Sequence, residues 1–566
     1  MQFTLSTLVG GRLASWLILI GISFAGVVAP AQETLPLLPK WTRFQGELVS
    51  LKSYDNPIQE VQVKAVFNSP AGEEYEVDGF WDGGNDWKVR FLPDLAGKWT
   101  FHITCSDEEN RGLHNLSGAF RCTAPLGRSA LTRSGPVRVS RDRTHFVHED
   151  GSPFFWMADT AWNGPLKSNE FDWKHYLAER RRQGFTAVQW VATSWRGAPD
   201  GDADGNRAFE GKENIRINPA FFQRLDRRVE AINDAGLLSV PVLLWAIRGA
   251  ENPVNVLPDD QVVMLARYML ARWGATYGAW FFGGDGDYSG SSAARWRDLG
   301  QAVFGGKRQF PVFMYPKGKS WVFEEFRDEK WMTALGYQSG HDIDDATNNW
   351  IHHGPVSRDW AKLPHRPIVN IEPAYEGIPS YSKKEPITAY EVRRALYWSL
   401  LNAPTAGVSY GAAGVWDWGD GDAPTPGHPH AGTPPDWRDA IHFEAGEQVA
   451  HLSALFQSIE FQKLRPDNGV LAEQPGDDVL SEYAASASSG DGLLVLVYTP
   501  VEKRLKINIA RLPAPLIAAW INPRTGERSS VLAVLRGAAL ECPAPGPGDW
   551  LLLLRSKPPE PELTEH

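Results

Sequence analysis

The sequence predicts an α/β protein built around a (β/α)8 TIM barrel, with one β-sandwich domain on each side of the barrel. Two observations predict the barrel. Between residues 125 and 455, eight apolar runs alternate with helix-like stretches over about 265 residues, the usual size of such a barrel. The runs are also continuously apolar, as parallel strands buried on both faces are. A doubly wound open sheet is the alternative, and it is less favoured because no G-x-G-x-x-G pattern follows any run.

The eight expected barrel strands are bounded by charged, amphipathic stretches. The clearest of these stretches, such as WKHYLAERRRQG and FFQRLDRRVEAINDAG, end at glycine, as helix C-termini often do. The strands are expected at 154–162, 185–193, 237–246, 278–285, 310–316, 332–339, 366–373 and 406–418.

The first 31 residues predict a secretory signal peptide. One positive charge, Arg12, precedes an apolar stretch from Leu13 to Val28, and Ala29-Pro30-Ala31 is a typical cleavage site. An uncleaved anchor is the alternative. We therefore expect a secreted or periplasmic protein, without a membrane partner after cleavage, since no later segment has 18 consecutive apolar residues.

Both domains that flank the barrel are expected to be β-sandwiches. Residues 32–124 and 456–556 consist of short runs rich in valine, aromatic residues and leucine, separated by Gly, Asn, Asp and Pro turns. Residues 557–566, with their prolines and charges, are expected to be a disordered tail. Among the three cysteines, Cys105 and Cys122 could pair across a hairpin, which would leave Cys542 alone.

Composition excludes several classes of partner and cofactor. The net charge is −11 and no basic face is apparent, which argues against nucleic acid as a partner. There is no H-E-x-x-H, C-x-x-C or Walker motif, so no cofactor or catalytic metal is expected. Twenty-four tryptophans are present, and their flat apolar faces suit either a large core or stacking on sugar rings.

Polar and aromatic residues gather at the C-terminal ends of the expected strands, where a barrel places its active site. We expect Asp159 to orient sugar hydroxyls or to brace a loop. We expect His341 either to brace a loop or to contact the substrate. Tryptophans at these ends could stack on sugar or pack in the core. The candidates are Asp159, Trp162, Gln189, Trp245, Asp285, Asp287, Tyr315, Gln338, His341, Glu372, Tyr410 and Trp416.

Two of these candidates have the spacing of a catalytic carboxylate pair. Asp285 ends the fourth run, in AWFFGGDGDYSG, and Glu372 ends the seventh, 87 residues later. Three βα units of about 30 residues cover that distance. Strands four and seven face each other across a barrel mouth, so the two carboxyl groups could act together in glycoside hydrolysis. Asp287 is the rival for the role of Asp285, and a plain Gly-Asp turn is the alternative.

Several motifs in order carry a family resemblance. WMADTAW, VQWVATSW, the G-G-D after strand four, GYQSGH, IEPAYEG and YGAAGVWDW lie between residues 135 and 455. Together they resemble the apiosidase-like glycoside hydrolases, which belong to a clan of retaining (β/α)8 glycosidases. The flanking domains resemble that family's companions, the last one being similar to a β-sandwich named for collagen binding. The resemblance implies Asp285 as acid/base, Glu372 as nucleophile, and a plant or algal polysaccharide side chain, with apiosyl linkages, as substrate.

The sequence departs from the family at one position and leaves two other classes open. Where the family often has His-Pro after strand five, this chain has Tyr315-Pro316. One alternative is a non-catalytic protein that binds carbohydrate or matrix through its sandwiches. The other is a calcium-dependent lyase, because Asp200, Asp202, Asp204 and Gly205 follow the order of a calcium loop. That loop lacks the carboxylate expected at its twelfth position, where Gly211 stands, so a solvated acidic loop is favoured.

Overall fold

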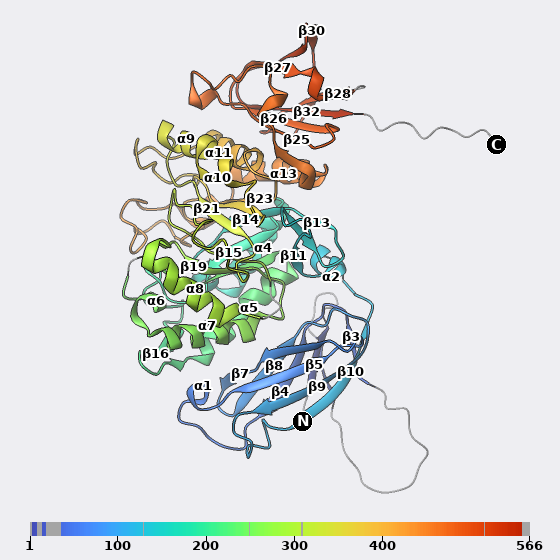
Figure 1. Ribbon diagram of the computed structural model, residues 1–566. Helices are drawn as coiled ribbons and strands as arrows, with labels where there is room; N and C mark the ends of the chain where they lie inside the picture. The colour runs from blue at the N-terminus through green and yellow to red at the C-terminus, as the bar shows by residue number, and fades with distance from the viewer. Residues whose placement is uncertain are drawn as a thin grey trace, which may run out of the picture.

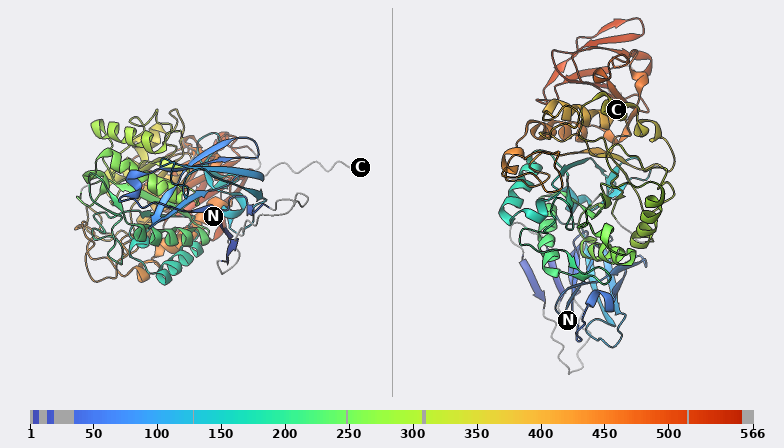
Figure 2. Two further views of the ribbon diagram at one scale, coloured as in Figure 1. Left: turned by 90° about the horizontal axis from the view of Figure 1, so that it is seen from below. Right: turned by 90° about the vertical axis from the view of Figure 1, so that its left-hand side faces the viewer.

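The computed structural model describes residues 3–7, 14–18, 35–127, 129–247, 249–306, 310–513 and 516–556. The molecule has three parts in a row, with a β-sandwich at the N-terminal end, a barrel in the middle and a second β-sandwich at the C-terminal end (Figures 1 and 2). Within the described part of the chain, no helix is both long enough and apolar enough to cross a membrane.

The middle part is the predicted (β/α)8 barrel. Its parallel sheet has the order β20-β19-β18-β15-β14-β23-β22-β21, which is the order of the chain read around a circle. The circle closes where the amides of Thr333 and Ala334, just before β21, donate to the carbonyl of Val312 in β20 at 3.0 and 3.1 Å. The strands are β14 (Trp156–Thr160), β15 (Ala187–Val191), β18 (Leu238–Trp245), β19 (Trp280–Gly284), β20 (Val312–Phe313), β21 (Leu335–Gln338), β22 (Ile368–Glu372) and β23 (Gly407–Tyr410).

Helices follow the strands and surround the sheet. Their starts are set by local sequence: Asn169 and Asn218 accept backbone N–H bonds at the first turns of α4 and α5, and Thr388 with Glu391 forms a capping box on α11. The longer helices are α4 (Glu170–Arg182), α5 (Pro219–Asp234), α7 (Asp259–Trp273), α8 (Gly290–Phe304), α9 (Asp345–His353), α11 (Ala389–Leu401) and α13 (Glu444–Gln457). The short ones are α3 (Gly164–Lys167), α6 (Pro253–Val256), α10 (Pro355–Asp359) and α12 (Trp437–Ala440).

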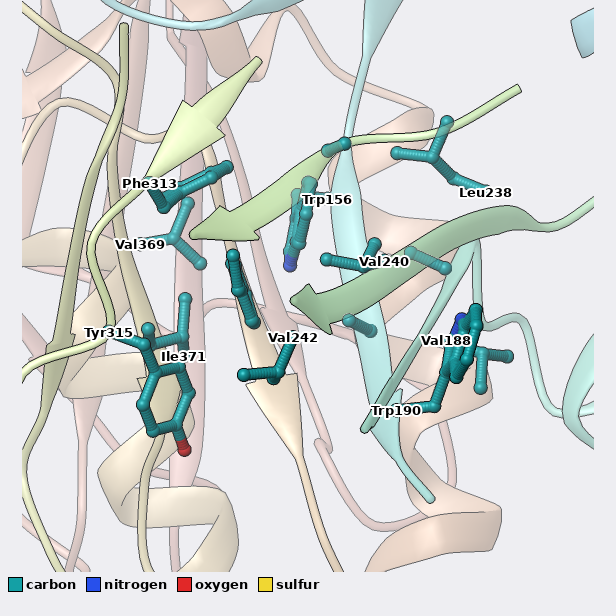
Figure 3. Packing of buried hydrophobic residues seen from close by; sticks show 14 of the residues in the cluster. Trp156, Val188, Trp190, Leu238, Val240, Val242, Phe313, Tyr315, Val369 and Ile371 are labelled. Carbon is teal, nitrogen blue, oxygen red and sulfur yellow. The ribbon is translucent and has the colours of Figure 1, made fainter. Parts of the chain in front are cut away.

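The interior of the barrel is filled with large apolar side chains. Trp156, Val242, Phe313, Val369 and Ile371 come from four different strands and pack in the same core (Figure 3). Ahead of the barrel, helix α2 (Ala130–Ser134) is followed by a small sheet of β11 (Val137–Val139), β12 (Phe146–His148) and β13 (Pro153–Phe154). Phe146 of β12 contacts the rings of Trp156 and Phe313, at 5.6 and 6.0 Å between centroids. The small sheet therefore covers the N-terminal end of the barrel and leaves the other end for a site.

The N-terminal sandwich consists of the sheets β2-β1-β4-β8-β7 and β3-β10-β9-β5-β6, with its own core around Phe67 and Trp99. Two of its strands lie within the expected signal peptide, and β1 pairs with β4; the expected cleavage site at 29–31 lies outside the described residues. The elements are β1 (Phe3–Thr7), β2 (Ala14–Ile18), β3 (Leu37–Pro39), β4 (Phe44–Val49), α1 (Pro57–Glu60), β5 (Val63–Asn68), β6 (Glu74–Asp78), β7 (Phe80–Gly83), β8 (Asp86–Phe91), β9 (Gly97–Cys105) and β10 (Leu116–Thr123).

The cysteines of this sandwich are not bonded to each other. Cys105, Cys122 and Cys542 are all free and buried. Cys122 in β10 lies opposite Gly97, at one end of β9, whereas Cys105 lies at the other end of β9. Eight residues of strand separate the two positions by roughly 26 Å, at about 3.3 Å per residue. A disulfide needs Cα atoms within about 7 Å, so the pairing considered from sequence does not occur.

The C-terminal sandwich consists of the sheets β24-β25-β26-β32-β28-β29 and β27-β31-β30. Its core contains Trp520, Leu552 and Cys542. The strands are β24 (Leu464–Pro466), β25 (Ala485–Ser489), β26 (Leu494–Thr499), β27 (Arg504–Asn508), β28 (Leu516–Ile521), β29 (Arg528–Ser530), β30 (Val534–Arg536), β31 (Ala539–Pro543) and β32 (Trp550–Ser556). The expected tail, 557–566, lies outside the described residues.

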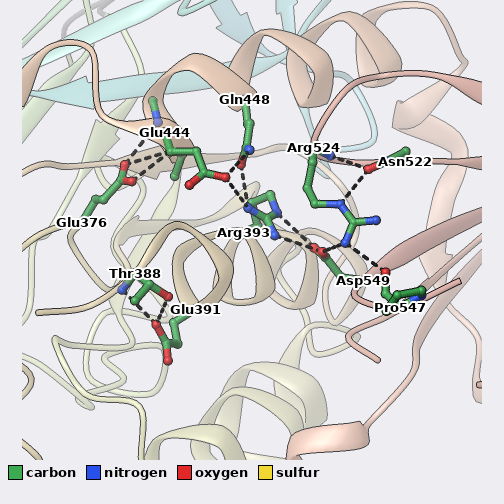
Figure 4. Close-up of polar contacts among 12 residues, drawn as sticks. Glu376, Thr388, Glu391, Arg393, Glu444, Gln448, Asn522, Arg524, Pro547 and Asp549 are labelled. Carbon is green, nitrogen blue, oxygen red and sulfur yellow. Dashed lines mark hydrogen bonds and ion pairs between the residues drawn. The ribbon is translucent and has the colours of Figure 1, made fainter. Parts of the chain in front are cut away.

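Buried ion pairs fix both sandwiches to the barrel. Arg272 of α7 bonds to Asp82 of the N-terminal sandwich at 2.6 Å and to Asp226 of α5 at 2.9 Å, and Arg90 of β8 reaches Asp226 at 2.8 Å. On the other side, Arg393 of α11 donates two hydrogen bonds to Asp549, which lies next to β32 (Figure 4). Since breaking a buried pair leaves an uncompensated charge, these contacts hold the three parts in a defined arrangement.

Candidate active site

A cavity of about 380 Å³ lies at the C-terminal ends of the barrel strands. Loops after all eight strands contribute to its lining. The lining residues are Trp162, Trp195, Arg196, Trp245, Ile247, Asp285, Lys317, Gly318, Gln338, Gly340, His341, Glu372, Tyr375, Ile378, Tyr381, Trp416, Gly427, His428, Pro429, His430 and Ala431. Its volume is at the small end of the range for ligand pockets, about 300–1,000 Å³.

Asp285 follows β19 directly and turns its carboxyl group into the cavity. The backbone there is left-handed, with φ of 43°, a conformation that Asp and Asn tolerate better than most residues. The preceding glycine is required for packing: a Cβ at Gly284 would lie 2.5 Å from Cγ1 of Val242 and 2.8 Å from the ring of Trp245. The next residue, Gly286, exchanges backbone hydrogen bonds with the loop after β20. The G-G-D-G sequence thus fixes the acid against two neighbouring strands.

Both carboxylate oxygens of Asp285 accept a hydrogen bond. The side-chain amide of Gln338 donates to Oδ1 at 3.0 Å, and Nη2 of Arg196 donates to Oδ2 at 3.2 Å. Burial raises the pKa of Asp285, while the charge of Arg196, the Gln338 bond and the more distant charge of Lys317 oppose the rise. Overall the pKa lies above its usual value, as a group that must donate a proton near neutral pH requires.

Glu372 is the last residue of β22, and only 11% of its side chain is exposed. Its Oε1 is 2.7 Å from Nε2 of His341, which comes from the loop after β21. Burial lowers the pKa of His341 to about 4, so the ring is neutral above that pH. A neutral imidazole can donate its Nε2–H to a carboxylate, which orients the glutamate without adding a positive charge.

The two carboxyl groups influence each other. Burial raises the pKa of Glu372 well above its usual value, and the negative charge of Asp285 raises it further; Arg196 and the hydroxyl of Tyr375 oppose the shift. Two carboxyl groups that share a desolvated site resist double ionisation. We therefore treat the pair as a coupled unit that holds one proton over a wide pH range.

Aromatic rings form much of the cavity wall. Three tryptophans come from the ends of three successive strands. Trp245 contacts both Trp162 and Trp195, at 5.7 and 4.4 Å between ring centroids. The ring of His428 contacts the rings of Trp195 and Trp416, at 5.4 and 4.8 Å between centroids. Such faces suit the C–H surface of a sugar ring, with the carboxyl pair beside it.

The structure brings seven of the twelve candidate residues to the cavity. They are Trp162, Trp245, Asp285, Gln338, His341, Glu372 and Trp416. The other five lie elsewhere: Asp159, Gln189, Asp287, Tyr315 and Tyr410.

The five residues outside the cavity have structural partners. Asp159 is fully buried and accepts bonds from Tyr176 at 2.6 Å and Arg180 at 2.7 Å, so it faces helix α4 and does not reach a sugar. Gln189 donates to the carbonyl of Ile371 inside the barrel. Asp287 points to solvent and pairs with Lys317 at 2.6 Å.

The remaining two are tyrosines of the core. Tyr315 is buried in the barrel core (Figure 3), and its ring contacts those of Trp162 and Phe281 at 5.5 and 5.3 Å between centroids. The hydroxyl of Tyr410 donates to Glu376 at 2.7 Å, and Glu376 also accepts the backbone N–H of Ala445 at the start of α13. A polar side chain at a strand end can thus turn towards the surrounding helices as well as into the mouth.

Sequence reasoning missed several residues that line the cavity. Arg196 and Trp195 follow the VQWVAT run closely, and a basic residue at that strand end was a usable signal. His428 and His430 come from the long loop after β23, more than ten residues beyond the strand, where nothing in the local pattern indicates a return to the mouth. Lys317, Tyr375 and Tyr381 are further polar or aromatic lining residues that the sequence did not point to.

The acidic loop at 200–205 is organised by an arginine. Asp202 accepts the backbone N–H groups of Asp204 and Asn206 at 2.9 and 2.8 Å. Arg224 lies beside it, 3.1 Å from Asp204 and 3.8 Å from Asp202. Among the described residues there is no group of three or more His, Cys, Asp or Glu side chains arranged to hold a metal ion.

A (β/α)8 barrel that presents an aspartate and a glutamate to one cavity from its fourth and seventh strands is the architecture of a glycoside hydrolase, and the comparisons with known proteins agree. The chain belongs to the apiosidase-like family, since the model of the apiosidase-like catalytic domain matches residues 140–463. Residues 37–106 match a domain of unknown function, DUF5060. No curated protein matches the chain.

Solved structures share the fold at low sequence identity. A glycoside hydrolase is 20% identical, with a TM-score of 0.67, and the match covers 76% of this chain and 99% of that one. A glycoside hydrolase family 5 protein from Bacteroides vulgatus is 19% identical, with a TM-score of 0.66, over 76% of this chain and 95% of that one. A second B. vulgatus protein, provisionally described as a glycoside hydrolase, is 16% identical, with a TM-score of 0.70. That match covers 92% of this chain and 100% of the other.

Proposed function

We propose that this glycoside hydrolase cleaves its substrate by a retaining mechanism in which Asp285 is the acid/base and Glu372 is the nucleophile. One observation carries the proposal: two buried carboxyl groups line the same cavity, and the charge of one raises the pKa of the other. Such a pair can hold one protonated and one ionised carboxyl group at the same pH, as the two roles require.

In the first step, an oxygen of Glu372 forms a bond to the anomeric carbon while the bond from that carbon to the leaving oxygen breaks. The proton of Asp285 goes to the leaving oxygen, so the aglycone departs as a neutral alcohol. His341 holds one oxygen of Glu372, which limits the orientations of the carboxylate before attack.

In the second step, Asp285 is a carboxylate and acts as a base. It takes a proton from water, the water oxygen bonds to the anomeric carbon, and the bond to Glu372 breaks. The site then holds the same number of protons as at the start, and the sugar has the configuration that it had in the substrate.

For the substrate, we propose a side chain of a plant or algal polysaccharide, with apiosyl linkages as the first candidate. The description of the matching family model supports apiose, and the tryptophan wall supports a sugar. A second candidate function is carbohydrate binding without catalysis. It predicts that the wild type binds glycan without turnover and that changing Glu372 leaves binding unaffected, and the mutational experiment below distinguishes the two functions.

We also propose that the protein is exported, from the charge, apolar stretch and Ala29-Pro30-Ala31 site of its first 31 residues. N-terminal sequencing of the protein secreted by the source cells tests this. A mature protein that begins after residue 31 supports export, and one that begins at residue 1 or 2 contradicts cleavage.

The catalytic assignment is tested with Asp285→Asn, Glu372→Gln and a matched control, Asp287→Asn, on pectic and apiose-containing glycans. Loss of an acid/base group costs about 10²–10⁴-fold in rate, and loss of the nucleophile should cost at least as much. Asp287 is exposed and lies outside the cavity, so its variant should stay close to wild type. Wild-type turnover in either catalytic variant would overturn the assignment; glycan binding without turnover in the wild type would favour the binding protein.

A further inference from the structure

Arg196 lies beside Asp285 in the cavity wall. It follows β15, and its guanidinium group bridges two parts of the cavity wall. Nη2 lies 3.2 Å from Oδ2 of Asp285, and Nη1 donates to the carbonyl of Gly427, in the loop after β23, at 3.3 Å. Only 24% of the side chain is exposed, so solvent screens its charge weakly.

The hydrogen bonds of Asp285 favour its ionised form. Gln338 donates to Oδ1 of Asp285 and also, at 2.7 Å, to the carbonyl of Pro316, which can only accept. The amide of Gln338 is therefore held with its nitrogen towards Asp285. With Arg196 on the other oxygen, both partners are donors, and a carboxyl proton finds no acceptor among them.

The charged and titratable groups around Asp285 come from several elements. Arg196 and Lys317, from the loops after β15 and β20, are positive, and Glu372 at the end of β22 shares the site. Tyr288 and Tyr381 lie near enough for the charge of Asp285 to raise the pKa of each further, beyond the larger effect of burial. Lys317 is bound at 2.6 Å to Asp287, which neutralises it, so Arg196 is the principal opposing charge.

We propose that Arg196 is the positioning residue that keeps Asp285 in the carboxylate form, after its proton has left, for the second half of the reaction. This rests on the retaining mechanism proposed above. The first step needs Asp285 protonated, and the second needs it ionised while water attacks the anomeric carbon. Burial alone favours the protonated form, so a neighbouring positive charge is what makes the base form accessible.

The proposal predicts opposite effects on the two steps. Without Arg196, the pKa of Asp285 rises, because the largest effect that opposes burial is lost and only the Gln338 bond and the charge of Lys317 remain. Proton donation then persists to higher pH. Below the raised pKa, Asp285 takes a proton back from solvent in the glycosyl-enzyme, so less of the base form is present, proton abstraction from water slows and the intermediate accumulates. A purely structural role for Arg196 would instead impair both steps together.

The test uses the full chain and a panel of 4-nitrophenyl glycosides, the apioside first, with whichever member the wild type cleaves. Arg196→Gln should shift the alkaline limb of kcat/KM up by about one pH unit or more, as loss of an opposite charge within 4–6 Å implies. It should also show a pre-steady-state burst of nitrophenol, and added azide, which needs no base to attack, should accelerate turnover.

Two matched variants complete the design. Arg196→Lys keeps the charge and should bring the alkaline limb back towards wild type, whereas Lys317→Gln should shift it less than Arg196→Gln does. If Arg196→Gln does not fold, Arg196→His replaces it: the histidine loses its charge near pH 6.5, and the burst should appear above that pH only.

The proposal is overturned if Arg196→Gln shows no burst, no azide effect and an unmoved alkaline limb. That outcome leaves the proposed function standing as long as Asp285→Asn and Glu372→Gln are inactive. Wild-type activity in Glu372→Gln would instead remove the retaining mechanism on which both rest.

Discussion

Burial raises the pKa of Asp285, which favours proton donation. The effect of that donation on the rate depends on the acidity of the leaving group. In Asp285→Asn the left-handed backbone is tolerated, but no proton is available. We expect the first step to slow by about 10²–10⁴-fold for natural glycosides and much less for aryl glycosides with acidic leaving groups. Single-turnover rates across a series of phenols measure this, and equal losses for all leaving groups would contradict the role of Asp285 as acid.

The pH profile should be governed by the carboxyl pair. Because burial raises the pKa of Asp285, the alkaline limb should lie above the usual aspartate value of about 3.9, and activity falls as pH rises through that limb. The acidic limb falls where both groups are protonated. Rates measured from pH 3 to 9 give both limbs; an alkaline limb at the ordinary aspartate value would contradict the burial argument.

His341 should affect the maximal rate in the pH profile more than the pH at which the rate falls. The ring is already neutral above about pH 4, so His341→Gln should lower kcat, through loss of the 2.7 Å contact to Glu372, and leave the alkaline limb unmoved. The same pH series on the variant checks this. A large movement of the alkaline limb would show that His341 titrates in the working range.

Among the elements, β19 is the strand whose packing most directly fixes the site. A side chain at Gly284 would collide with Val242 and Trp245, so Gly284→Ala should displace the turn that carries Asp285. We expect a loss of about 1–3 kcal/mol in the free energy of unfolding, typical of overpacking, together with a loss of activity. Denaturant titration and turnover measure both. Gly490→Ala, in open space at a turn, is the control and should change neither.

The elements of the barrel were predictable, and the reason is physical. A parallel strand covered on both faces reads as an unbroken apolar run, so all eight strands could be predicted from sequence, and the acids at the ends of β19 and β22 with them. Side-chain direction could not be read in the same way: Asp159 turns to Arg180, away from the mouth. Nor could the return of His428 from a long loop, where Arg196 donates to the carbonyl of the preceding Gly427 and the ring of Trp416 contacts that of His428.

At the scale of the whole molecule, buried ion pairs join the sandwiches to the barrel. Asp226 accepts bonds from Arg90, Arg272 and Trp273, and although burial alone would raise its pKa, the two arginines lower it to about 2. Its folded pKa is below its unfolded value, so its stabilising contribution is complete above about pH 3.9 and is lost as pH falls through 2.

Asp226→Asn should therefore destabilise the junction between the N-terminal sandwich and the barrel. Two buried arginines would lose their shared carboxylate, which typically costs about 3–5 kcal/mol in the free energy of unfolding. Unfolding monitored by tryptophan fluorescence at pH 7 and at pH 2 tests this. The difference in the free energy of unfolding between variant and wild type should be smaller at pH 2 than at pH 7. An equal difference at both pH values would contradict the charge argument.

The central claim is that Glu372 attacks the sugar and Asp285 serves both steps, so the product must keep the configuration of the substrate. Time-resolved ¹H NMR of the first-formed sugar, recorded before mutarotation, measures that configuration directly. We expect the product to appear first as the anomer present in the glycoside. Initial release of the opposite anomer would contradict the account, because it would make Glu372 a base for water and leave no covalent intermediate.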